Sequence, residues 1–216
     1  MKRMRRLGWV WAAAALAAAL VPAQILAADP VAKIVFTKSF PGSAPAWYSI
    51  SLDRTGAAEY REDPKDENPI KFQLNQSDAA QIFDLAGKLE YFKRKLESPA
   101  KVAKMGDKTL HYEKGGQSGE TTFNYTEDPD GRTITDWFER ISETERHLIQ
   151  LQRVVKYDKL GVNDALLQLE ITLDRKRLIA PEQFLPMLDR VAKNESFVHM
   201  ARQRAASIAT QIRNSK

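Results

Sequence analysis

The 216-residue sequence contains no cysteine. This absence excludes disulfide bonds, thiol chemistry and zinc sites built on cysteine, and it excludes a lipid anchor attached to a terminal cysteine. The folded chain must therefore be held together by packing and hydrogen bonds alone. The length is sufficient for one sizeable hydrophobic core or two smaller ones.

Histidine is scarce as well, and the signatures of common catalytic sites are missing. The three histidines, His111, His147 and His199, show no pair at the four-residue helical spacing of a zinc site. The closest approach to a hydrolase serine turn, Ser118 in the run GQSG, is expected between two strands rather than before a helix. The run DPDG at residues 128–131 is better explained as a turn than as part of a calcium loop. We therefore predict no catalytic, cofactor-binding or metal-binding residues.

The longest apolar run lies near the amino terminus, at residues 7–21. Four basic residues precede it, and the small residues Ala27 and Ala28 follow it. This order is typical of a secretory signal peptide, and the run is shorter than the roughly 20 residues that span a bilayer. We predict that residues 1–28 form a signal peptide, cleaved after Ala27 or Ala28, with a retained membrane anchor as the alternative. The mature protein would then be periplasmic or extracellular and would have no membrane span.

The positive charge is concentrated in that same segment. The whole chain has a formal charge of +5, but removal of the four basic residues of the signal peptide leaves about +1. Nucleic-acid binding is therefore not expected. Residues 29–140 carry 16 basic and 19 acidic residues (net −3), whereas residues 141–216 carry 13 and 9 (net +4).

The first half of the mature chain is rich in predicted β-strands. Alternating or β-branched runs predict strands at residues 31–37, 47–52, 57–61, 70–74, 108–113 and 120–125. A DRTG turn at residues 53–56 makes a hairpin of residues 47–61, because glycine accepts a positive φ. A helix capped by Ser77, with Ala80 and Phe83 on its apolar side, follows the fourth strand. The fold class is therefore α+β, with a mostly antiparallel sheet and packed helices.

The hairpin sequence YSISLDRTGAAEY at residues 48–60, followed by a helix that ends in Tyr91 and Phe92, resembles small α+β domains of exported bacterial proteins of unknown function. The resemblance covers about half of the mature chain. It implies the fold and export, and it implies no site residues, because that family has no established activity.

One long helix is predicted to join the two halves of the chain. Between residues 133 and 157, apolar residues recur at steps of three and four: Ile134, Trp137, Phe138, Ile141, Leu148, Leu151 and Val155. No glycine or proline interrupts this pattern. The run SETE at residues 142–145 fits a capping box, so a break at that point is the alternative.

The remainder is predicted to be helical, which gives an α+β domain at residues 29–140 and a helical domain or extension at 141–216. Asn163 is expected to cap a helix at residues 164–178, and Pro181 to open another. Pro186 would kink that helix unless the helix begins later than Pro181. The last helix, residues 197–213, would bury Val198 and Ala201. The run from 184 to 212 resembles a HEAT-type helix pair, but three copies are not present, so a helical bundle is favoured.

Five aromatic residues of the predicted strands are the candidate interaction surface: Trp47, Tyr48, Tyr60, Tyr112 and Tyr125. Exposed together, they would form a platform for a protein or a carbohydrate. Buried, they would form the core beneath the helices.

These observations favour a non-catalytic, exported protein that binds another protein, of unknown identity, with its oligomeric state left open. One alternative is a hydrolase whose site is assembled from scattered carboxylates and tyrosines. Another is a small-ligand carrier with a pocket between the sheet and the long helix.

Overall fold

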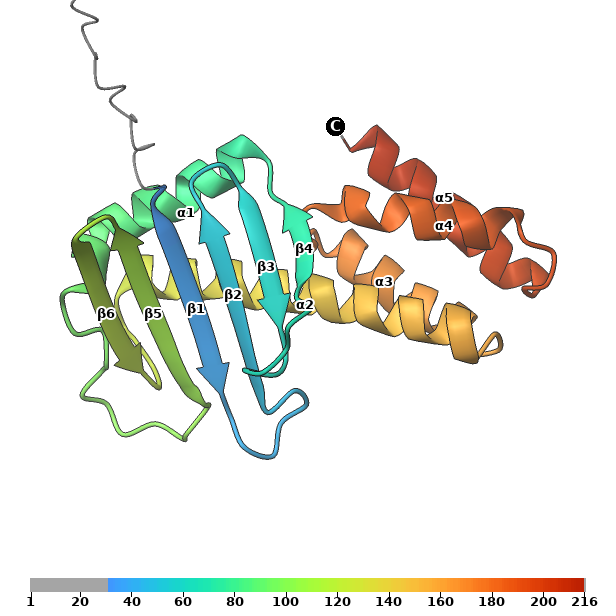
Figure 1. Cartoon of the computed structure of the whole chain (residues 1–216). Coiled ribbons are helices and arrows are strands. Elements are labelled where there is room, and N and C mark those ends of the chain that lie inside the picture. The colour runs from blue at the N-terminus through green and yellow to red at the C-terminus, as the bar shows by residue number, and fades with distance from the viewer. Residues whose placement is uncertain (1–30, 216) are drawn as a thin grey trace, which may run out of the picture.

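The computed structural model describes residues 31–215. The predicted signal peptide lies outside these residues. The described chain has the predicted α+β class, with a six-stranded antiparallel sheet, helices packed against it and a helical carboxyl-terminal half (Figure 1). No helix within residues 31–215 is long and apolar enough to cross a bilayer.

The sheet has the strand order β4-β3-β2-β1-β5-β6, and every neighbouring pair is antiparallel. Its strands are β1 (Lys33–Ser39), β2 (Trp47–Asp53), β3 (Ala57–Arg61), β4 (Ile70–Gln73), β5 (Asp107–Lys114) and β6 (Gln117–Phe123). The predicted hairpin is β2–β3. Its turn is held by the Asp53 carboxylate, which accepts hydrogen bonds from the backbone N–H groups of Thr55 and Ala57.

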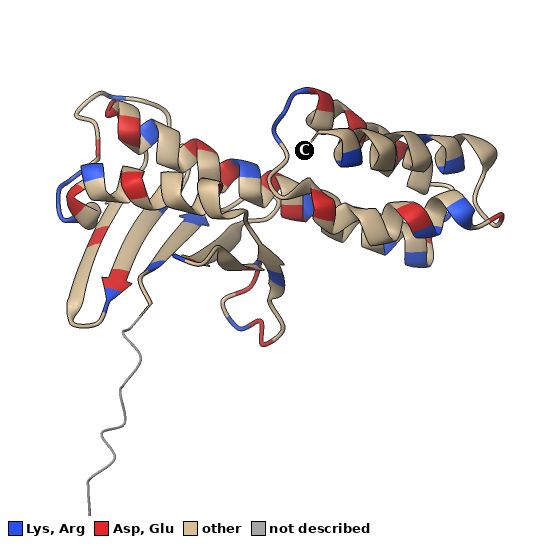
Figure 2. Ribbon diagram, turned by 90° about the horizontal axis from the view of Figure 1, so that it is seen from above, with Lys and Arg blue, Asp and Glu red and all other residues tan. Residues whose placement is uncertain are grey.

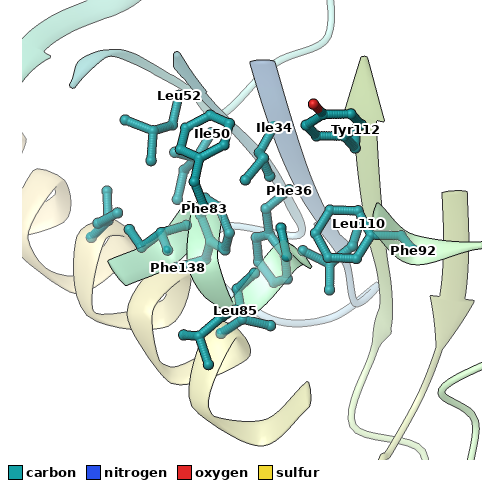
Figure 3. Close-up of a cluster of buried hydrophobic side chains, with 14 of the residues drawn as sticks. Ile34, Phe36, Ile50, Leu52, Phe83, Leu85, Phe92, Leu110, Tyr112 and Phe138 are labelled. Carbon is teal, nitrogen blue, oxygen red and sulfur yellow. The ribbon is translucent and has the colours of Figure 1, made fainter. Parts of the chain in front are cut away.

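Helices cover one face of this sheet (Figures 1 and 2). Helix α1 (Gln76–Lys88), the short 3-10 helix η1 (Glu90–Phe92) and the first part of α2 (Pro129–Tyr157) lie on that side. Along β1, β2, β3 and β5 alternate side chains point at them and are buried, because side chains alternate across a strand. Ile34, Phe36, Ile50, Leu52, Leu110, Phe83, Leu85 and Phe138 meet in this first core (Figure 3).

Asn75, not Ser77 as predicted, caps helix α1. The Asn75 side-chain oxygen accepts from the backbone N–H of Asp78 at 2.8 Å, and the Ser77 hydroxyl donates to that same oxygen. The helix therefore starts two residues earlier than predicted. This shift places Ala79 in the core and leaves Ala80 exposed, contrary to the prediction.

This cap gives a first prediction. Asn75→Ala is expected to lower the free energy of unfolding by about 1 kcal/mol, because the N–H of Asp78 loses its acceptor. Ser77→Ala should cost less than about half as much, since the Ser77 hydroxyl in the first turn only donates to the Asn75 oxygen and satisfies no backbone N–H group. Urea unfolding of both variants measures the difference, and a larger loss in Ser77→Ala would show that Ser77 caps the helix.

Helix α2 runs without a break over 29 residues and joins the two halves, as the apolar pattern predicted. Asp128 caps it, accepting from the N–H of Gly131 at 2.9 Å, and Pro129 occupies its first turn. The alternative break does not occur. Ser142 and Glu145 lie buried inside the helix instead of capping a new one.

The second half of α2 packs into a helical bundle with α3 (Val162–Asp174), η2 (Pro181–Phe184), α4 (Leu185–Lys193) and α5 (His199–Asn214). A second core lies between these helices. It contains Leu148, Leu151 and Val155 from α2, with Leu166, Phe184, Leu188, Val191, Ala205 and Ile208 from the others. Helix α2 therefore contributes apolar side chains to both cores. This explains why apolar residues recur along most of its length.

Two local predictions in the bundle were wrong, and for Pro186 the alternative of a later helix start holds. Asn163 lies inside α3 instead of capping it, and it bonds the Arg204 side chain of α5. Pro186 does not kink a helix, because Pro181 begins η2 and Pro186 begins α4 separately. Val198 precedes α5, which starts at His199, and it is 46% exposed. The buried face of α5 begins instead at Ala201.

Candidate functional site

The five aromatic residues do not share a surface. Tyr48, Tyr60 and Tyr112 point to the covered face of the sheet and are at most 7% exposed. Trp47 neighbours Tyr48 in the same strand and is only partly buried, so alternation places it on the opposite face. Tyr125 lies beyond the end of β6. The platform prediction is therefore wrong, and for the three tyrosines the core alternative is confirmed.

The buried tyrosines are also unsuited to acid-base chemistry. Burial raises the pKa of Tyr48 and of Tyr60 well above that of a free phenol. The Tyr60 hydroxyl donates to the Glu62 carboxylate at 2.9 Å and lies 3.4 Å from the Ser142 hydroxyl. Both phenols stay protonated at neutral pH and act as hydrogen-bonding groups of the sheet–α2 interface.

The largest concave site at the junction of sheet and bundle is a groove of about 700 Å³, here called the junction groove. It is lined by Ala44, Pro45, Glu62, Glu143, Arg146, His147, Ile149, Gln150, Arg153, Gln168, Ile171, Thr172 and Arg175. A smaller hollow of about 310 Å³ between α2 and the β1–β2 loop adjoins it and shares Pro45, Glu143 and Arg146.

The groove forms where α2 and α3 run antiparallel, and each helix supplies one stripe of side chains. On α2 the stripe is Arg146, Gln150 and Arg153, at steps of four and three. On the α3 side it is Gln168 and Ile171 of the helix and Arg175, which caps its carboxyl end, at steps of three and four. Residues at these steps share one helix face. The buried apolar faces of both helices pack into the second core, so the two stripes that line the groove lie at the surface.

His147 and Thr172 fix the register of the two helices at the bottom of the groove. Their side chains lie 2.9 Å apart, and the Thr172 hydroxyl donates to the backbone carbonyl of Gln168 at 3.1 Å. Because that hydroxyl has one proton, Nε2 of His147 must be the donor to it. Burial lowers the pKa of His147, so the ring is neutral and serves as a structural tie.

The groove is positively charged. Arg146, Arg153 and Arg175 are exposed, and none of them forms a salt bridge within residues 31–215. The two carboxylates of the lining have other partners. Glu143 binds Arg177 at 2.8 Å, and Glu62 accepts from Tyr60.

A buried carboxyl group lies close to this junction. Glu145 of α2 is fully buried, and Oε1 accepts a hydrogen bond from the Gln183 side chain of η2 at 2.9 Å. Oε2 has no partner within the described residues. Burial raises the pKa of Glu145 to about 7. The backbone N–H of Ile179 donates to the neighbouring Thr144 hydroxyl, so η2 and the segment before it are tied to the centre of α2.

The remaining ionic clusters are structural pairs. Lys38 of β1 binds Glu139 of α2 at 2.8 Å, and Arg204 of α5 binds Glu170 of α3 at 2.9 Å. His111 lies on the uncovered face of the sheet, 3.3 Å from Glu120. In residues 31–215, no three side chains of the metal-binding types converge on one point.

The three groove arginines were not among the residues predicted from the sequence. Two signals pointed toward them. The helical half has the excess of positive charge, and the α2 stripe of Arg146, Gln150 and Arg153 recurs at helical steps beside the apolar stripe. The position of Arg175 opposite this stripe depends on the register of α2 and α3, which the sequence does not show.

Comparison with known proteins adds no functional assignment. No protein-family model matches the sequence, and no curated protein matches it significantly.

Proposed function

We propose that this protein is an exported, non-catalytic module that binds another protein. The proposal rests on the junction groove. This groove has a volume of about 700 Å³, and three exposed arginines of its lining form no salt bridge within residues 31–215. Arginine is enriched at protein interfaces, where its planar group forms paired hydrogen bonds. The groove also lies on two packed helices, which hold its side chains in place.

The properties of the polar clusters support binding over catalysis. Burial raises the pKa of the sheet tyrosines, whereas a nucleophile or general base needs its pKa lowered or brought near the working pH. The pocket between β6 and α2 has a volume of about 190 Å³, below the roughly 300 Å³ at which small-ligand sites begin. The hollow between α2 and the β1–β2 loop reaches about 310 Å³, but five of its eleven lining residues are charged, whereas small-ligand sites are lined mainly by apolar side chains. Glu145 has a pKa of about 7, which would suit a general base, but it is fully buried and lines none of the pockets described above, so no substrate reaches it. Neither the hydrolase nor the ligand carrier is therefore favoured by a specific observation.

The binding proposal is tested by affinity capture with the mature chain, residues 29–216. We expect one protein of an envelope extract to be retained above a blank resin, to be identifiable by mass spectrometry and, once purified, to bind with a measurable Kd. Failure of every retained protein to bind in purified form would refute the proposal. Substrate turnover by the mature chain that is abolished by substitution of a single Asp or Glu residue would favour the hydrolase instead.

Export is a separate part of the proposal and has its own test. The full-length chain, expressed in a bacterium, should yield a periplasmic or secreted product that begins at Ala28 or Asp29. Amino-terminal sequencing of the fractionated protein measures this. A product that keeps Met1 and sediments with membranes would favour the retained anchor, and one that keeps Met1 in the cytoplasm would refute export.

A further inference from the structure

We propose that the junction groove binds an extended acidic segment of the partner protein, with carboxylates spaced three residues apart. This inference rests on the proposed function and specifies the chemistry of its ligand. It follows from the charge, the spacing and the hydrogen-bonding groups of the groove.

The charge of the groove favours a carboxylate ligand. Arg146, Arg153 and Arg175 each carry a guanidinium group that can form two parallel hydrogen bonds with one carboxylate. Both carboxylates of the lining already accept hydrogen bonds from other groups, so they leave the arginines available.

The spacing of the arginines favours an extended ligand. Arg146 and Arg153 are seven residues apart on α2, which is about 10.5 Å along the helix axis at 1.5 Å per residue. In a polyproline II conformation, side chains three residues apart point the same way and are separated by about 9.3 Å. Two carboxylates at that spacing would each reach one arginine. Arg175 lies across the groove on α3 and can engage a third.

The uncharged groups favour a polypeptide over an inorganic anion. Gln150 and Gln168 lie between the arginines on facing helices, and each side-chain amide can both donate to and accept from a peptide backbone. Pro45, Ile149 and Ile171 add apolar surface, against which the aliphatic parts of a peptide can pack. Phosphate ions would use the arginines alone.

The experiment is a fluorescence anisotropy titration of the mature chain with two labelled peptides of the same composition. In one, four glutamates are spaced three residues apart by alanine and proline, and in the other the glutamates are consecutive. The groove variant combines Arg146→Gln, Arg153→Gln and Arg175→Gln. We expect the spaced peptide to bind the wild-type chain, with affinity at least about tenfold weaker in the groove variant and falling as salt is added.

A matched control removes the same charge elsewhere. Lys101→Gln, Lys114→Gln and Arg190→Gln change three exposed residues outside the groove, and this control should bind the spaced peptide within about twofold of wild type. Circular dichroism verifies that both variants are folded. The inference is overturned if groove and control variants lose affinity equally, if the consecutive peptide binds as tightly, or if phosphate or anionic vesicles bind and the spaced peptide does not.

The two proposals fail in different ways. A captured partner that binds the groove variant as tightly as wild type would uphold the binding function and overturn the acidic-segment inference. Absence of any partner would refute the binding function, whatever the peptides do.

Discussion

Replacing Glu145 with glutamine is expected to raise the free energy of unfolding by about 3 kcal/mol near pH 8 and to change it little near pH 4. Burial raises the pKa of this carboxyl group to about 7 in the folded chain, against 4.5 for an ordinary glutamate. Between these values the native state holds a proton that the unfolded state has released. The stability of the wild-type chain therefore falls as the pH rises from about 4.5, and this loss levels off above about 7.

Glutamine preserves the shape and the hydrogen bond of this site without the charge. Its side-chain oxygen can still accept from Gln183, which now bonds Oε1 of Glu145 at 2.9 Å. The gain appears only where the wild-type residue would have to be ionised in a fully buried position. Urea unfolding of both proteins at several pH values measures it, because the difference between them cancels the titration of all other groups.

The exposed Glu182→Gln substitution is the control, since it makes the same change of charge at a surface position of η2. Its effect should remain within about 0.5 kcal/mol at every pH. A stability difference for Glu145→Gln that does not vary with pH would contradict the argument, as would an ordinary pKa for Glu145 measured by NMR.

Sequence pattern was sufficient for the elements and their order, because each is amphipathic in its own right. Strands β2 and β3 alternate cleanly around the DRTG turn, and apolar residues recur at helical steps on both sides of the buried polar residues in the middle of α2. The same reasoning failed where local chemistry allowed two answers. Ser77 and Ser142 are both good caps in isolation, but Asn75 already satisfies the start of α1, and packing on both sides keeps α2 helical through Ser142.

The site was harder to predict than the fold, because it depends on how elements meet. Successive side chains of a strand point to opposite faces of the sheet, so Trp47 and Tyr48 cannot share a face. A platform that includes both was therefore incompatible with the strand predicted for these residues. The junction groove requires the register of α2 against α3, which the His147–Thr172 contact fixes. That contact joins residues 25 positions apart, and no local pattern indicates it.

Phe138→Ala is expected to lower the free energy of unfolding by about 3–5 kcal/mol and to destabilise the bundle together with the sheet. The Phe138 ring is fully buried and stacks on Phe36 of β1 with centroids 5.0 Å apart. Its removal leaves a cavity between α2 and the centre of the sheet. Because α2 continues unbroken into the second core, loss of its packing on the sheet should also destabilise the part of α2 that packs in the bundle.

Two probes separate the halves of the chain. A chain that comprises residues 29–216 has two tryptophans, Trp47 and Trp137, and both lie in the sheet half, so its fluorescence follows that half. Circular dichroism at helical wavelengths is dominated by the bundle and α2. Coincident urea transitions of the two signals, shifted together in the variant, are the expected result for cores joined by one helix.

Leu151→Ala provides the reciprocal test from the other side, because Leu151 is 1% exposed in the second core. It should cost about 2–5 kcal/mol and should also shift both signals together. A Phe138→Ala variant in which fluorescence shifts while the helical signal stays in place would show that the halves unfold independently. In that case α2 would connect two separate domains, and the junction groove would lie between bodies free to move instead of on one rigid surface.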